Sequence, residues 1–200
     1  PLELATIQFG YGFALLWNGR LEQAGAQLRA ALLQARQTGL VMLEAQCLVY
    51  LAVIARLKGQ LSEVRSLTSL ALEKSEASQR VDYAGLARAN LAWLAWRIGD
   101  LPAVRHEGTV ALENWQEAGT VTPFRWLALW PLIGAALKES SLAQALTYAA
   151  MLQDDTQQPQ PQTICERLDS AFNAWRAGHG VQALAHLDAA ASAAASRGYL

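Results

Sequence analysis

Apolar residues recur three and four positions apart along most of the chain, as in Leu48, Leu51, Ala52 and Ala55. This spacing is typical of helices with one buried face, and no stretch shows the sustained alternation expected of a β-strand. Short polar segments with a glycine separate the apolar runs, which predicts helices joined by tight turns. We expect five first helices at 4–17, 41–57, 82–97, 123–137 and 163–176, and five second helices at 21–37, 61–78, 101–117, 141–153 and 180–196.

The turn signal recurs with a period of about 40 residues: the anchors are Gly19, Gly59, Gly99, Ser140 and Gly178. Small residues keep fixed places relative to these anchors, and such recurrence indicates an internal repeat. Five positions after each anchor stand Ala24, Val64, Val104, Ala145 and Ala183, and twelve after stand Ala31, Ala71, Ala111, Leu152 and Ala190. We therefore expect one repeat domain over residues 1–200, with units at about 1–39, 40–80, 81–120, 121–160 and 161–200.

Residues at the expected helix ends support this division. Asp100 before Pro102 suits a helix start, as does Thr122 before Pro123. Left-handed caps are expected just past three second helices, at Gly39, Gly119 and Gly198.

Residues 154–162 form one polar stretch that contains two prolines. We expect it to be a long loop that interrupts the array. Because only one helix pair follows it, a domain boundary at this point is the alternative.

The pattern resembles the tetratricopeptide repeat (TPR), which places a small residue in its first helix, a glycine turn, an alanine five residues on and another seven beyond. The first three units carry this pattern as Gly12/Gly19/Ala24/Ala31, Ala52/Gly59/Val64/Ala71 and Ala92/Gly99/Val104/Ala111. The family's usual proline near the end of the second helix is absent, and the period is 40 rather than 34. The longer period is similar to that of the MalT-like variant. This resemblance implies an all-α fold, a right-handed solenoid of about five antiparallel helix pairs.

The resemblance also implies a function. MalT-like repeats occur in large bacterial regulators, between an ATP-binding and a DNA-binding module. We therefore expect a non-enzymatic sensor or interaction region of a bacterial transcriptional regulator or signalling protein, and we interpret the chain, which starts at Pro1, as a piece of something longer. A free-standing scaffold or adaptor is the alternative.

First helices line the concave side of such solenoids, so the candidate surface comes from positions ten, six, three and two before each anchor. Those positions are rich in aromatic and basic residues, the usual anchors of interfaces. We expect a protein or peptide partner, or a small anionic-apolar effector, to contact Phe13, Trp17, Arg56, Trp93, Trp96, Arg97, Trp130, Lys138, Trp175 and Arg176.

Two other interpretations of these residues remain open. Trp93 and Trp96 are three apart on one helix face, so both could belong to the core. The basic residues lie at the ends of first helices, where they also complement the helix dipole.

Composition narrows the functional classes. With 52% apolar and 16% charged residues, the chain has too large an apolar fraction for a disordered segment. A formal net charge of −1 does not suit a nucleic-acid binder or a polybasic membrane patch. No apolar run reaches the length of a membrane span. Two cysteines are too few for a disulfide framework, which favours a reducing compartment, the cytoplasm.

The sequence contains no motif of a familiar active site. It has no phosphate-binding glycine loop, no Gly-x-Ser-x-Gly turn and no Cys-x-x-Cys or His-x-x-x-His spacing, so we expect neither a metal nor a cofactor. Cys47 and Cys165 lie within helical patterns as small core residues. The Asp154-Asp155 pair lies in the expected loop, and we expect its carboxylates to be solvated rather than catalytic.

The last three residues, Gly198-Tyr199-Leu200, resemble the opening of a sixth unit. A solenoid needs a polar capping repeat at its end for solubility, and none follows here. We therefore expect this end to be adhesive and to favour a homodimer.

Overall fold

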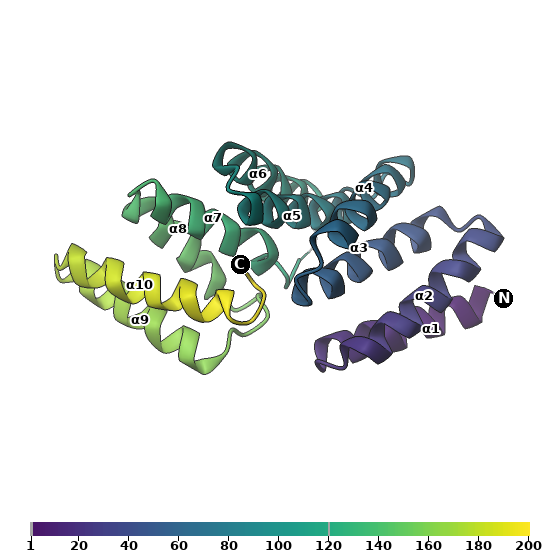
Figure 1. Ribbon diagram of the computed structural model, residues 1–200, viewed down its shortest axis with the longest axis horizontal. Coiled ribbons are helices and arrows are strands. Elements are labelled where there is room, and N and C mark those ends of the chain that lie inside the picture. Colours follow the sequence, from purple (N-terminus) through teal and green to yellow (C-terminus); the bar gives the residue numbers. More distant parts are fainter. Residues whose placement is uncertain (1, 120) are drawn as a thin grey trace. The chain divides into compact units, whose positions relative to one another are not determined.

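The computed structural model describes residues 2–119 and 121–200, and these residues form ten α-helices and no strand (Figure 1). The all-α fold of five successive helix pairs is confirmed, and most helix bounds lie within two residues of those expected. The helices are α1 (Leu2–Trp17), α2 (Leu21–Thr38), α3 (Val41–Leu57), α4 (Leu61–Ala77), α5 (Val81–Ile98), α6 (Leu101–Glu117), α7 (Trp126–Lys138), α8 (Leu142–Leu152), α9 (Gln162–Arg176) and α10 (Gly180–Ala195).

Each turn within a helix pair contains a residue in the left-handed conformation. The four anchor glycines have positive φ angles, and Ser140 adopts the same conformation with φ 58°. Glycine accepts this geometry without a steric penalty, whereas a residue with a Cβ is strained there. The fourth turn keeps the shared hydrogen bonds all the same, because Ser140 N donates to Leu137 O at 3.0 Å and Ser141 N to Ala136 O at 2.8 Å. The anchor alignment, with serine in place of glycine, is therefore confirmed.

The expected small residues lie where the paired helices meet. Ala24, Val64, Val104, Ala145 and Ala183 all have no exposed surface. At Gly12, an added Cβ would lie only 2.9 Å from Cγ of Leu28 on α2. Small residues at fixed positions thus allow the paired helices to approach closely.

Helix ends follow the sequence signals in all but one case. The Asp100 side chain accepts a hydrogen bond from Ala103 N at 3.0 Å and caps α6. Gly39, Gly119 and Gly198 have φ angles of 67°, 63° and 77°. The expected start at Thr122 is wrong, because α7 begins at Trp126 after a turn.

The chain divides into two compact parts, residues 1–90 and 91–200, and the division falls inside α5. In the first part α1 pairs with α2 and α3 with α4, while α2 packs on α3. In the second part α7 pairs with α8 and α9 with α10, α6 packs on α7, and α10 also contacts α7. None of the described helices is long and apolar enough to cross a membrane.

A polar loop separates α8 from α9, as expected, but it is tightly attached to the protein. Gln157 Oε1 accepts from Arg125 N and its Nε2 donates to Thr122 O, both at 3.1 Å. Gln158 N donates to Pro123 O at 2.8 Å. The loop therefore holds the segment before α7 in a turn, which explains why that helix starts late.

The two glycines of α1 allow a test of the close approach between paired helices. We expect Gly12→Ala to lower the free energy of unfolding by about 1–3 kcal/mol, because its Cβ overlaps Leu28. Gly10 has nothing within 4 Å of an added Cβ, so Gly10→Ala should raise the free energy of unfolding by about 0.5–1 kcal/mol. Urea denaturation measures both changes, and equal effects of the two substitutions would contradict the packing assignment.

Candidate functional site

Three of the ten candidate residues, Arg56, Trp93 and Trp130, have no exposed surface. The expectation that they line an open groove is therefore corrected: in this structure they belong to the core. Burial lowers the pKa of the Arg56 guanidinium well below its ordinary value. The guanidinium of Arg97, which is exposed, lies over the Trp93 ring at 5.1 Å from its centroid.

The buried Trp130 is hydrogen-bonded to the loop between α8 and α9. Its indole Nε1 donates to Gln160 Oε1 at 3.1 Å, and Trp126 Nε1 makes the matching bond to Gln158 Oε1 at 3.0 Å. Two loop glutamines thus satisfy two indole donors of α7. Sequence reasoning assigned this loop no such role.

The aromatic candidates of α1, Phe13 and Trp17, are half-buried against Tyr50 of α3. The Phe13 and Tyr50 ring centroids are 5.0 Å apart, and those of Trp17 and Tyr50 are 6.4 Å apart, both in edge-to-face geometry. Burial raises the pKa of the Tyr50 hydroxyl. These rings stabilise the contact between the first two repeats.

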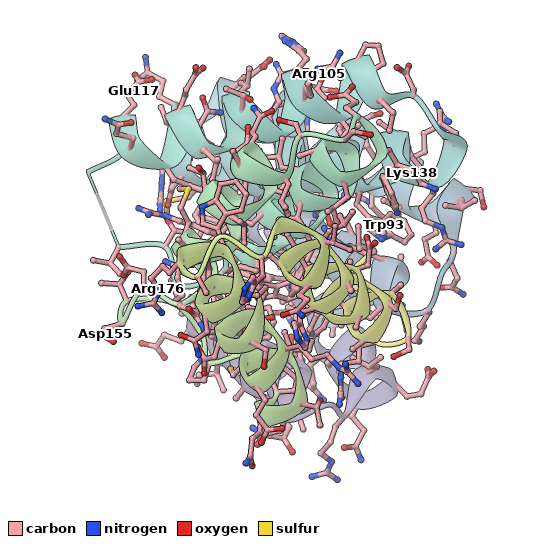
Figure 2. All side chains as sticks on the ribbon, turned by 90° about the vertical axis from the view of Figure 1, so that its left-hand side faces the viewer. Trp93, Arg105, Glu117, Lys138, Asp155 and Arg176 are labelled. Carbon is pink, nitrogen blue, oxygen red and sulfur yellow. The ribbon has the colours of Figure 1, made fainter. Side chains whose placement is uncertain are left out.

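The candidates of α9, Trp175 and Arg176, are exposed beside a shallow hollow of about 290 Å³. The Arg176 guanidinium already donates to Phe172 O at 3.3 Å and to Asn173 Oδ1 at 2.9 Å. Figure 2 places Arg176 on the other side of the view from Lys138. The basic residues of the second part therefore do not form one continuous line.

Trp96 and Lys138, in contrast, come together in a pocket of about 470 Å³ between α7 and α10, which we call the α7–α10 pocket. Two other expected groove positions, Gly134 and Leu137, also line it. The complete lining is Trp96, Gly134, Leu137, Lys138, Asp188, Ala191, Ser192, Ala195 and Leu200.

Close packing shapes one wall of this pocket. An added Cβ at Gly134 would lie 2.9 Å from Cη2 of Trp96 and 3.2 Å from Cδ2 of Leu200, so only glycine admits both side chains. The Tyr199 ring lies 4.5 Å from the Trp126 ring. The C-terminal residues, which we expected to form an adhesive end, thus pack on α7. The homodimer stays a prediction.

The pocket combines apolar and charged groups. Trp96, Leu137 and Leu200 supply apolar surface, while Lys138 on α7 and Asp188 on α10 supply opposite charges. Asp188 was missed from the sequence because second helices were expected to lie away from the groove, and Leu200 because the end of the chain was expected to open a sixth unit. No local signal marks them, since the contact of α10 with α7 follows from tertiary packing. Such a pocket suits a ligand with an apolar body and a small charged group.

Of the two thiols expected in the core, Cys47 is buried there and Cys165 is half-buried. Cys47 is fully buried, and desolvation raises its pKa to about 12, so it is a neutral thiol at physiological pH. Cys165 donates its Sγ hydrogen to Gln160 O at 3.4 Å, and burial raises its pKa as well. Among the described residues, no three His, Cys, Asp or Glu side chains form a group that could hold a metal ion.

In comparisons with known proteins, no family model matches this chain, and no curated protein matches it. The pocket and its residues are therefore interpreted from their own chemistry.

Trp130 provides a test of how the loop is attached. We expect Gln160→Ala to lower the free energy of unfolding by about 1–3 kcal/mol, because the buried indole donor loses its acceptor. Gln162→Ala is the control, since that side chain is exposed and its amide donates to Glu166 on the same helix. Chemical denaturation compares the two variants, and a loss of similar size at both positions would count against the assignment.

Proposed function

We propose that this chain is a ligand-binding repeat module of the TPR-like, MalT-like type, and that its binding site is the α7–α10 pocket. In this proposal it serves as the sensor or interaction region of a bacterial transcriptional regulator or signalling protein. The observation that carries the binding role is the pocket itself, where an indole, two leucines and two opposite charges from separate helices line one cavity.

The lining favours one class of ligand. A volume of about 470 Å³ lies within the range of small-molecule sites. Trp96 and Leu137 offer surface to an apolar group, and Lys138 offers an ammonium to a carboxylate. Asp188 disfavours a multiply charged anion such as phosphate, because like charges repel. The ligand we propose is therefore a small apolar carboxylate or the carboxyl end of an apolar peptide.

Ligand binding at this site can affect the rest of the module through the packing of α7 and α10. A ligand that contacts both α7 and α10 favours the arrangement in which these helices are close. Its effect on any neighbouring domain is limited to its difference in affinity between the two arrangements. The signal is thus passed by a coupling between ligand binding and helix packing, with no chemical step.

A scaffold or adaptor function is the second candidate, and one observation favours it. Leu4, Ile7 and Tyr11 of α1 are exposed although they are large and apolar, which is typical of surfaces that contact another protein. For either function we propose a cytoplasmic location, supported by the two free cysteines.

The pocket can be tested with N-acetyl-leucine, a probe that has one apolar group and one carboxylate. We expect the Trp96 indole N–H signal, assigned with Trp96→Phe, to shift in NMR titrations while the signal of buried Trp115 stays in place. Lys138→Gln should weaken binding about two- to fivefold, as expected for an exposed ion pair. N-acetyl-leucinamide, which lacks the carboxylate, should bind equally to both forms.

Arg176→Gln is the matched control, because Arg176 lies outside the pocket and is exposed. It should leave the N-acetyl-leucine titration unchanged. If the Trp96 signal does not move up to the solubility limit of the probe, the proposed ligand class is wrong.

A further inference from the structure

One face of α1 carries apolar residues that no part of the described chain covers. Leu4 is 51% exposed, Ile7 66% and Tyr11 53%, and Ala14 is exposed as well. Because these residues are three or four positions apart, they share one side of the helix. We call these four residues the α1 face.

The internal repeat shows what covers the corresponding face elsewhere. Ile7, Tyr11 and Ala14 lie twelve, eight and five residues before the turn anchor Gly19, and the same positions of α3 are Cys47, Leu51 and Ile54. These three are 0%, 4% and 3% exposed, and α2 packs on α3. In this repeat, the second helix of the preceding pair therefore covers the face.

The same rule holds in the second compact part. On α7 the corresponding residues are Ala128, Leu132 and Ala135, which are 0%, 1% and 0% exposed. Here α6 packs on the helix. Two independent examples within one chain thus assign this face of a first helix to contact with a preceding second helix.

α9 supplies the opposite case. It follows the long loop, and its corresponding residues are Glu166, Ser170 and Asn173. Glu166 and Asn173 are exposed and Ser170 is half-buried. Where this face is turned to solvent, the sequence is thus polar, whereas α1 places isoleucine, tyrosine and alanine there. An apolar face of this kind marks a contact surface.

We propose that the α1 face binds a helix with the chemistry of α2, docked as α2 docks on α3. That chemistry is an amphipathic helix rich in alanine, glycine and leucine. The buried residues of α2, which packs on both α1 and α3, are Ala24, Gly25, Leu28, Ala31, Leu32 and Ala35. In a repeat array each unit contacts only its neighbours, so the occupant is the second helix of a further helix pair. The inference does not rest on the proposed ligand site, because the α1 face lies in residues 1–90 and the pocket in residues 91–200.

The period of the repeat shows where a helix must be added to the chain so that it docks on the α1 face with the spacing of the repeat. Val41 follows α2 and its cap and stands 18 residues before Gly59, as Pro1 stands 18 residues before Gly19. A duplicate of residues 21–40 joined ahead of residue 1 therefore continues the spacing. We expect the extended chain to unfold on the order of 5 °C higher than the original.

The residues of α9 provide the matched control. Ile7→Glu combined with Tyr11→Ser gives α1 the residues found at the same positions of α9. In the original chain this double substitution should keep the unfolding temperature within about 2 °C, because both positions are exposed. In the extended chain it should abolish the gain in unfolding temperature.

Three outcomes would overturn the proposal. The first is an extended chain with no higher unfolding temperature than the original. The second is an equal gain with and without the double substitution, since the added helix would then dock elsewhere. The third is a dimer of the original chain in light scattering that Ile7→Glu converts to a monomer, because the occupant would then be a second copy.

Discussion

Each repeat of this protein depends on one constraint, that two helices joined by a very short turn must approach closely along their length. The turn requires a residue in the left-handed conformation, which glycine provides four times and Ser140 once. The approach requires small residues at fixed positions, and Ala24, Val64, Val104, Ala145 and Ala183 are fully buried there. Because each pair buries its apolar faces on adjacent helices, the high apolar content of the chain does not require one deep core.

The loop between α8 and α9 is the main departure from this scheme. Gln158 and Gln160 accept hydrogen bonds from two tryptophan indoles of α7, so side-chain amides satisfy donors that would otherwise be buried without partners. After the loop, α10 contacts α7. This contact brings Asp188 and Leu200 to Trp96 and Lys138, and the pocket results from it.

The first helices also show how composition follows exposure. One face is apolar and buried in α3 and α7, polar and largely exposed in α9, and apolar and exposed in α1. The first two cases follow the ordinary relation between burial and polarity. The third departs from it, which is why the α1 face indicates an interface. Together with the pocket it makes recognition, by a ligand or by a helix, the role that the described residues support best.

The sequence alone determined the helices, their pairing and their turns, because these depend on apolar spacing, turn glycines and small residues within about 40 positions. It could not determine which first-helix side chains reach solvent. Trp93 and Trp96 have the same spacing signal, yet Trp93 is fully buried while Trp96 lines a pocket beside Gly134. Exposure, the late start of α7 and the part played by Asp188 all depend on segments distant in sequence. Only tertiary packing brings those segments together, and it therefore decided the candidate site.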